Sequence, residues 1–126
     1  MSRILIIDDD AVVRKALHGA LTKAGYSVLD ASSGSSGLEM AKGSKPDLII
    51  CDIDMPGMTG FETLKALKAD PQTKDLPFVF LTGSSDAIAG KLGRTLGAEE
   101  FIEKPFSFSK LLAVVGTRLK HGGPRQ

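Results

Sequence analysis

Short blocks of consecutive apolar residues alternate along the chain with longer segments in which apolar residues recur every three or four positions. The short blocks are typical of strands buried on both faces, and the longer segments are typical of amphipathic helices. Strands are predicted over residues 3–7, 26–31, 48–51, 78–81 and 101–102, and helices over residues 11–24, 36–41, 61–68, 87–96 and 109–119. Glycine and proline mark several of the boundaries, with Gly43 and Pro46 predicted to end the second helix.

Strands and helices in strict alternation predict a parallel sheet, because each helix can carry the chain back to the start of the next strand. The predicted fold class is therefore α/β: a doubly wound, five-stranded parallel sheet with five helices on both faces. We expect one domain over residues 1–120, followed by a flexible Gly- and Pro-rich tail over residues 121–126.

Composition narrows the possible functions. Sixteen Lys and Arg against fifteen Asp and Glu leave a formal net charge of +1, which gives no electrostatic reason to bind nucleic acid or an anionic membrane. Apolar runs reach only about five residues, whereas a membrane-spanning helix needs about 20. A single cysteine and the absence of a leader pattern at the start predict a soluble, cytoplasmic protein.

Polar side chains follow four of the five predicted strands. Asp8 and Asp9 follow the first, Asp52 the third, Thr82 the fourth, and Lys104 the fifth. Since ligands bind beyond the carboxyl ends of the strands in an open parallel sheet, these groups are expected to meet at one edge. Their convergence predicts a functional site there.

The chemistry of this set favours a metal and a phosphoryl group. Clustered carboxylates repel one another unless a cation lies among them, and hard oxygen ligands suit Mg²⁺. Lys104 would neutralise a phosphoryl group, Thr82 would hydrogen-bond it, and Asp52 could be the nucleophile that carries it.

Four sequence blocks then identify a family resemblance. ILIIDDD, DLIICDIDMPGMTG, FVFLTG and GAEEFIEKPF occur in order and resemble the signature blocks of a response-regulator receiver domain of two-component signalling systems. The resemblance covers about residues 3–120. It implies a flavodoxin-like or CheY-like fold with strand order 2-1-3-4-5, and identifies the predicted domain as a receiver.

The resemblance implies a role for each acidic residue. Asp52 resembles the phosphoacceptor, which attacks a phosphohistidine on a partner. Asp8 and Asp9 resemble the pair that holds Mg²⁺ together with Asp52 and the backbone carbonyl of Asp54.

The resemblance also implies how the domain switches. Thr82 resembles the hydroxyl that bonds the new phosphoryl group, and Lys104 the lysine that pairs with it. Phe101 resembles the aromatic residue whose ring turns inward on phosphorylation, and Pro105 is expected to follow a cis peptide bond. The surface that changes would lie on the fourth helix, fifth strand and fifth helix.

The predicted function is a phosphorelay signalling switch rather than an enzyme, because it would assist only its own phosphorylation and autodephosphorylation. The expected partners are a sensor histidine kinase or histidine phosphotransfer protein and a downstream protein or output domain. No direct binding of nucleic acid or membrane is expected. The domain is expected to be a monomer or a phosphorylation-dependent dimer, and either a free-standing receiver or part of a longer regulator.

Five further residues invite separate hypotheses. Asp10 extends the acidic pair and is interpreted as a helix-start residue. Asp54 is hypothesised to alter autodephosphorylation through water access. Gly90 and Gly93 would lower the stability of the fourth helix. His18 has no evident partner in the sequence and is expected at the surface.

Other readings of the acidic residues remain open. Asp8 and Asp9 could cap the first helix, which does not exclude metal binding. Asp52 and Asp54 resemble the paired aspartates of haloacid-dehalogenase-like phosphohydrolases, although those enzymes place the nucleophile on the first strand. A flavodoxin-like flavin carrier is the third reading, but Asp8–Asp10 would repel its phosphate.

Overall fold

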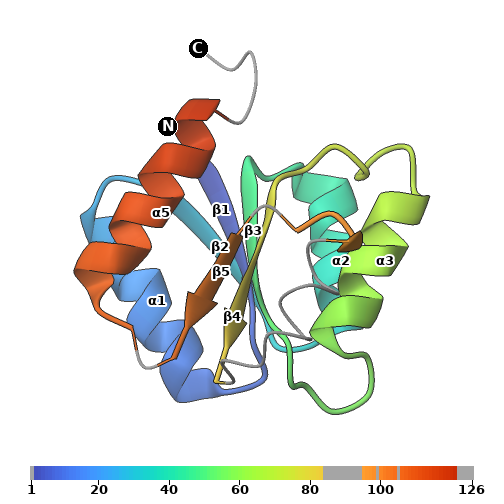
Figure 1. Ribbon diagram of the computed structural model, residues 1–126, viewed down its shortest axis with the longest axis horizontal. Helices are drawn as coiled ribbons and strands as arrows, with labels where there is room; N and C mark the ends of the chain where they lie inside the picture. Colours follow the sequence, from blue (N-terminus) through green and yellow to red (C-terminus); the bar gives the residue numbers. More distant parts are fainter. Residues whose placement is uncertain (1, 84–94, 99, 105, 122–126) are drawn as a thin grey trace.

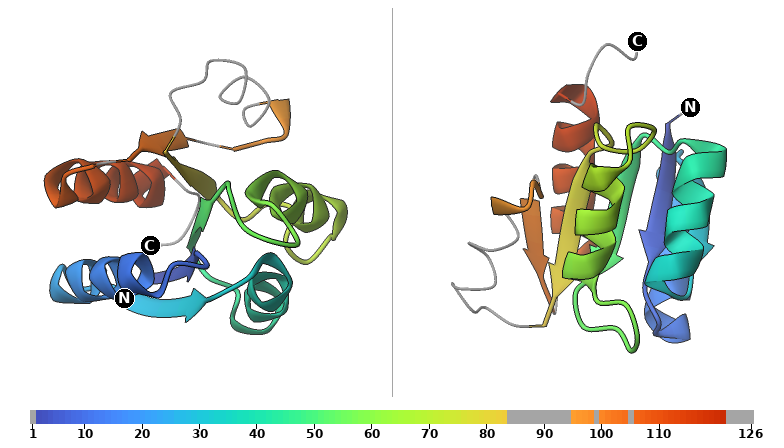
Figure 2. Two further views of the ribbon diagram at one scale, coloured as in Figure 1. Left: turned by 90° about the horizontal axis from the view of Figure 1, so that it is seen from below. Right: turned by 90° about the vertical axis from the view of Figure 1, so that its right-hand side faces the viewer.

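The computed structural model describes residues 2–83, 95–98, 100–104 and 106–121 (Figures 1 and 2). Five parallel strands form one sheet in the order β2-β1-β3-β4-β5. They are β1 (Arg3–Ile7), β2 (Ser27–Ala31), β3 (Leu48–Asp52), β4 (Phe78–Thr82) and β5 (Glu100–Glu103). The predicted fold class and strand order are confirmed.

Helices cover both faces of this sheet. They are α1 (Ala11–Lys23), α2 (Gly34–Ser44), α3 (Gly60–Ala69) and α5 (Phe108–His121). Figure 1 shows α1 and α5 on one face and α2 and α3 on the other. The part of the chain that the structure describes thus holds four of the five predicted helices. The remaining prediction, over residues 87–96 with Gly90 and Gly93, lies almost wholly outside the described residues.

The sheet divides the core into two layers because successive strand residues point to opposite faces. Ile4 and Ile6 of β1 pack with Leu17 and Leu21 of α1 and with apolar residues of α5. The alternate residues of β1 pack with buried residues of α2 and α3. All ten residues of β3 and β4 are buried, which explains why each strand is apolar up to its last residue, Asp52 or Thr82.

Strand register decides which side chains meet at the carboxyl edge. Ile7 pairs with Cys51, so Asp8 and Asp52 occupy neighbouring positions at the ends of two adjacent strands, β1 and β3. Thr82 pairs with Glu103 at the end of β4, and the Lys104 amide donates to the Thr82 carbonyl at 2.6 Å. The polar residues at the carboxyl ends of these strands therefore lie at one edge of the sheet, as the sequence predicts.

Helix α2 is longer than predicted. It begins at Gly34, where the Ser33 hydroxyl accepts a hydrogen bond from the Ser36 amide at 3.2 Å, and it passes through Gly43 to Ser44. The helix stops because Pro46 prevents Lys45 from continuing it, and Lys45 takes a left-handed conformation with φ of 48°. The prediction that Gly43 ends the helix is wrong, since a glycine is tolerated in a last turn.

The other helix boundaries differ by one or two residues. Thr59 and Glu62 form a reciprocal capping box that starts α3 at Gly60, one residue before the predicted Phe61. At the other end of the chain, α5 reaches His121 instead of the predicted 119, so it includes the first residue of the predicted tail. Residues 122–126 lie outside the described ranges. Among the described residues, no helix has the length and apolar character needed to cross a membrane.

Candidate functional site

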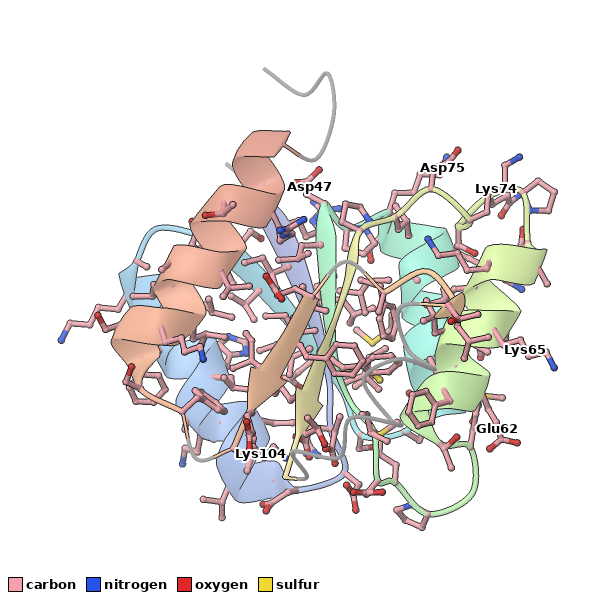
Figure 3. The ribbon with its side chains drawn as sticks, viewed as in Figure 1. Asp47, Glu62, Lys65, Lys74, Asp75 and Lys104 are labelled. Carbon is pink, nitrogen blue, oxygen red and sulfur yellow. The ribbon has the colours of Figure 1, made fainter. Side chains whose placement is uncertain are left out.

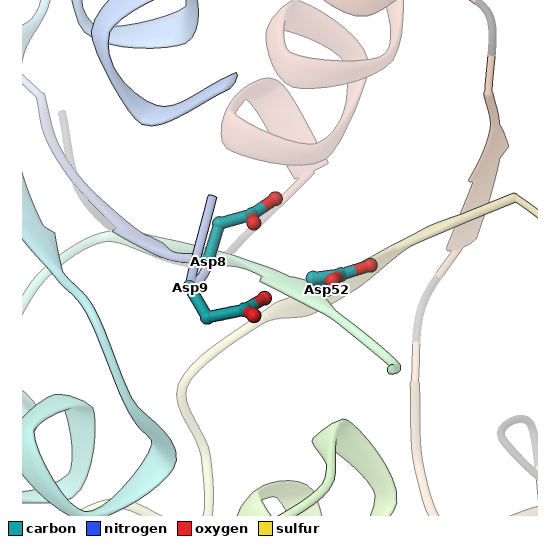
Figure 4. A group of neighbouring side chains, drawn as sticks. All are labelled: Asp8, Asp9 and Asp52. Atoms are coloured by element: carbon teal, nitrogen blue, oxygen red, sulfur yellow. The ribbon is translucent and has the colours of Figure 1, made fainter. Parts of the chain in front are cut away.

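Three carboxylates converge at the carboxyl edge of the sheet (Figure 4). Asp8, Asp9 and Asp52 each offer an oxygen, and these oxygens lie within 4.8 Å of one another. Asp8 is fully buried and Asp52 is 6% exposed, whereas Asp9 is exposed. Three hard oxygen donors, one of them open to solvent, fit Mg²⁺, which binds few protein ligands and keeps several waters.

The loop that carries the first two aspartates is fixed by its own hydrogen bonds. A carboxylate oxygen of Asp8 accepts from the Asp10 amide at 2.9 Å. The Asp10 side chain caps α1 by accepting from the amides of Val12 and Val13 at 2.9 and 3.4 Å. The interpretation of Asp10 as the helix-start residue is confirmed, and Asp9 is left pointing toward the site (Figure 4).

Lys104 supplies the positive charge of this site. Its Nζ atom lies 3.2 Å from Oδ1 of Asp52 and 3.5 Å from Oδ2 of Asp8. Figure 3 places Lys104 at the carboxyl end of the sheet, far from Asp47 at the opposite end. The lysine side chain is 26% exposed, so a ligand can reach it from solvent.

The pKa values of Asp52 and Lys104 reflect the close approach of these charged groups. Burial raises the pKa of Asp52 above its ordinary value, and the neighbouring Asp8 raises it further, with Lys104 opposing both. Burial by itself would lower the pKa of Lys104, but the negative charges of Asp8 and Asp52 raise it above its ordinary value. The cluster is thus short of positive charge, which is the condition under which a cation binds.

The two predicted switch residues lie on the neighbouring strands β4 and β5. Thr82 is buried at the end of β4, next to Lys104 through the backbone hydrogen bond described above. Phe101 is partly buried on the α2–α3 side of the sheet, and its ring centroid lies 5.3 Å from that of Phe80. This position fits an ordinary core aromatic residue, and the switch role that the resemblance implies for Phe101 stays a prediction.

One predicted residue, Asp54, does not add its side chain to the cluster. Asp54 is exposed in the loop after β3, and its carboxylate is outside the group formed by the described acidic residues. Its expected contribution, a backbone carbonyl, stays a prediction. Pro105 and its expected cis peptide bond lie outside the described residues.

Gly60 allows α3 to approach the end of β3. Its amide donates to the Ile53 carbonyl at 2.8 Å. A Cβ atom at this position would overlap the Asp52 carbonyl oxygen and lie 2.7 Å from the Ile53 Cα atom. Only glycine permits this approach, which helps to fix the backbone that carries Asp52.

Three polar residues next to the site are not predicted from the sequence. Arg14 donates from Nη1 to the Asp8 carbonyl at 2.8 Å. Its Nε atom lies 3.9 Å from Oδ1 of Asp30, and Nδ1 of His18 lies 2.8 Å from the other carboxylate oxygen of Asp30. His18 lies at the surface, as expected, with 44% of its side chain exposed. Its partner, the Asp30 carboxylate, is not evident from the sequence. The available signals were the four-residue spacing of Arg14 and His18 on α1 and a charged residue within a strand.

Cys51 lies directly before the acceptor candidate but contributes no reactive group. It is fully buried, and its thiol lies 3.2 Å from the Asp52 carbonyl. Burial raises the pKa of this thiol well above its ordinary value, and the charges of Asp52 and Asp8 raise it further. Cys51 therefore acts as a small apolar residue of the core.

Comparisons with known proteins show which protein family this chain is similar to. The family model described as the response regulator receiver domain matches residues 4–116. Protein PilH of Pseudomonas aeruginosa is 34% identical over 119 residues, which cover 94% of this chain and 98% of PilH.

Other relatives are longer. The transcriptional regulatory protein AfsQ1 of Streptomyces coelicolor is 35% identical over 97% of this chain, but the chain spans only about half of AfsQ1, 53% of its length. Among solved structures, the chemotaxis response regulator CheY4 of Vibrio cholerae is 34% identical with a TM-score of 0.88. That match covers 94% of this chain and 98% of CheY4.

Proposed function

Because this chain belongs to the response regulator receiver domain family, we propose that it is a phosphoacceptor switch in which Asp52 accepts a phosphoryl group from a phosphohistidine. The observation that carries the proposal is the position of Lys104, which lies within 3.5 Å of both Asp52 and Asp8. Because the Lys104 ammonium group is shared by two carboxylates, it can shift to a phosphoryl oxygen when Asp52 becomes phosphorylated. Family membership and this geometry support the same function.

Asp52 is the proposed nucleophile. One of its carboxylate oxygens attacks phosphorus, a P–O bond forms, and the P–N bond to the donor histidine breaks with its electron pair returning to the ring nitrogen. The product is a mixed anhydride on Asp52. Only 6% of Asp52 is exposed, so the donor must enter along the open side of the cluster, next to Asp9.

Asp8, Asp9 and Asp52, together with the Asp54 carbonyl, would hold Mg²⁺ in this proposal. When bound, the ion would offset the charge of the incoming phosphoryl oxygens. The close approach of three carboxylate oxygens, which repel one another without a cation, supports this ligand set.

The chain's other residues would retain and report the phosphoryl group. Lys104 would pair with a phosphoryl oxygen, and the Thr82 hydroxyl would donate a hydrogen bond to another. A phosphoryl group adds a charge of about −1.5 to −2, which would bias Thr82 and Phe101 toward a second arrangement. The reshaped surface would include β5, α5 and the segment over residues 87–96 that the sequence predicts as the fourth helix.

The proposed partners follow from this chemistry. A sensor histidine kinase or a histidine phosphotransfer protein would supply the phosphoryl group, and a downstream protein or output domain would read the changed surface. We propose a cytoplasmic location, no direct contact with nucleic acid or membrane, and either a monomer or a dimer that forms on phosphorylation. The domain would turn over only its own phosphoryl group. The phosphohydrolase alternative, which needs both Asp52 and Asp54, gains no support because the Asp54 carboxylate lies outside the cluster.

Asp54 would instead affect how long the phosphoryl group lasts. Its exposed carboxylate, two residues after Asp52, would change the access of water to the anhydride. An Asp54→Asn variant is expected to have an altered phosphoryl lifetime, followed as loss of the added mass over time. An unchanged lifetime would rule this role out.

Beryllofluoride, which mimics a phosphoryl group, tests the proposed function. Amide NMR spectra of the wild type are expected to shift at Thr82 and Phe101 when beryllofluoride is added with Mg²⁺. The Asp52→Asn variant should show no such shifts because it lacks the carboxylate to which the mimic binds. Equal responses from the two proteins would contradict the proposal.

A further inference from the structure

Arg14 is the feature of the site that the proposed function leaves unexplained. Its side chain is 21% exposed, and its guanidinium faces the carbonyl of Asp8, not a carboxylate of the acidic cluster. A hydrogen bond from a guanidinium to a backbone carbonyl fixes the orientation of the peptide group that contains this carbonyl. We infer that Arg14 is a positioning residue that holds the Asp8–Asp9 peptide in the orientation required for Mg²⁺ binding; this inference rests on the proposed function.

The hydrogen bonds around Asp8 show why one more bond matters. The Asp8 amide donates to the Ala31 carbonyl at 3.1 Å, and the Asp8 carboxylate accepts from the Asp10 amide at 2.9 Å. The backbone carbonyl is the remaining polar group of Asp8, and its oxygen accepts a hydrogen bond from Arg14 at 2.8 Å. This carbonyl belongs to the peptide group that leads into Asp9, so its orientation governs where the Asp9 carboxylate points.

Asp30 and His18 hold Arg14 in place. Asp30 lies on β2 beside Ala31, and its two oxygens face Arg14 at 3.9 Å and His18 at 2.8 Å. Both basic side chains project from α1, four residues apart, so they converge on one carboxylate. The acidic loop is thereby tied to β2 twice, through the Ala31 carbonyl and through Asp30.

Accurate placement matters most for Asp9. Mg²⁺ demands near-ideal octahedral geometry, so a ligand that swings by a fraction of an ångström loses affinity. Asp8 is held by its burial, but Asp9 is exposed, and among the described residues its carboxylate accepts no hydrogen bond that would orient it. Its direction therefore depends on the backbone that Arg14 secures.

The sign of the effect separates positioning from simple electrostatics. Arg14 carries a positive charge close to a cation site, so its removal should tighten Mg²⁺ binding if charge were its only contribution. If Arg14 positions the ligands, its removal should weaken Mg²⁺ binding despite the more negative surroundings. The two explanations predict changes in opposite directions.

Isothermal titration calorimetry with Mg²⁺ on the unphosphorylated protein tests this inference. Arg14→Met is expected to raise the Mg²⁺ dissociation constant about 10-fold, the lower end of the cost of losing a ligand-orienting hydrogen bond. Arg14→Lys keeps the charge but cannot hold both Asp8 and Asp30, so about a 3-fold rise is expected by comparison. An unchanged or smaller constant in Arg14→Met would overturn the inference.

Arg3 offers a matched control. Its Nη1 atom donates to the Ser44 carbonyl at 2.7 Å, at the opposite end of β1 from Asp8. Arg3→Met thus removes a similar arginine–carbonyl bond and is expected to leave the Mg²⁺ constant unchanged. An equal weakening in Arg3→Met would assign the effect to lost stability and overturn the inference.

Three further outcomes are distinct. If Arg14→Met does not fold, Arg14→Lys decides alone, and a wild-type constant in that variant overturns the inference. If the wild type itself does not bind Mg²⁺, the metal site of the proposed function fails. If the wild type binds Mg²⁺ and Arg14 variants match it, only the positioning role fails.

Discussion

The Nζ atom of Lys104 lies 3.2 Å from Oδ1 of Asp52 and 3.5 Å from Oδ2 of Asp8, so one ammonium group contacts carboxylates at the ends of two adjacent strands, β3 and β1. Asp8 is fully buried and Asp52 nearly so. Without Lys104, both would be left as neighbouring anions with little access to water. The lysine therefore contributes to folding as well as to the proposed chemistry.

Replacing Lys104 by methionine is expected to destabilise the metal-free protein by roughly 2 kcal/mol, because it leaves buried carboxylates without their partner. Urea unfolding in the presence of a chelator would measure the change. Saturating Mg²⁺ should reduce the loss, since a bound cation takes over part of the neutralisation. Lys65→Met, at an exposed position of α3, is the control and should change stability by less than about 0.5 kcal/mol. Equal stability of the two variants would contradict this account of Lys104.

Replacing Asp52 by asparagine is expected to stabilise the metal-free fold at pH 7. Burial and Asp8 raise the pKa of Asp52, so the folded state binds its proton more tightly than the unfolded state does. The ionised carboxylate therefore costs stability at neutral pH, and its removal should raise the Tm by a few degrees, the shift that about 1 kcal/mol produces.

The same raised pKa gives this gain a definite pH dependence. The cost of ionising Asp52 is fully present above its folded pKa and vanishes below its ordinary value of 3.8. The Tm difference between Asp52→Asn and the wild type should therefore shrink as the pH falls through that window. A difference that grows on acidification would show that the sign assigned to Asp52 is wrong.

Mg²⁺ is expected to stabilise the wild type, because only the folded state brings the three carboxylates together. At ten times its dissociation constant, a ligand adds about 1.4 kcal/mol. Asp9→Asn should lose most of this gain, and Asp9 is the best choice because its exposed side chain contributes little to the core. Asp54→Asn keeps its backbone carbonyl and should retain the gain. Equal Mg²⁺ stabilisation of the two variants would remove Asp9 from the ligand set.

Gly60→Ala is expected to destabilise the protein by roughly 2 to 3 kcal/mol, because the new Cβ atom would collide with backbone atoms of Asp52 and Ile53, which have little room to move. Gly19→Ala is the control. Gly19 lies within α1 with no atom within 4 Å of an added Cβ, so alanine there should gain about 0.5 to 1 kcal/mol. Urea midpoints that move in the same direction for both would contradict the close approach at Gly60.

The strands and their order could be predicted because local pattern and global burial agree. β3 and β4 are buried along their whole length, so their apolar runs are unbroken, and each ends at a polar residue of the site, Asp52 or Thr82. Since parallel strands share one carboxyl edge, naming the residues after each strand was enough to bring Asp8, Asp52 and Lys104 together.

Other features depend on contacts that no local pattern reveals. The Thr59–Glu62 capping signal is present in the sequence and starts α3 at Gly60. Gly60 by itself indicates a loop, so the two local signals conflict. The link from His18 through Asp30 to Arg14 depends on how α1 lies across β2, so only the three-dimensional packing discloses it. Sequence reasoning identified the residues proposed to touch a ligand and missed those that orient them.

The most direct test of the account is the intact mass of the protein after incubation with acetyl phosphate, with and without Mg²⁺. The wild type is expected to gain one base-labile phosphoryl group only when Mg²⁺ is present. Asp52→Asn should gain none, and Asp54→Asn, which changes a neighbouring exposed carboxylate, should still gain one. No gain in the wild type, or an equal gain in Asp52→Asn, would contradict the claim that Asp52 is the phosphoacceptor.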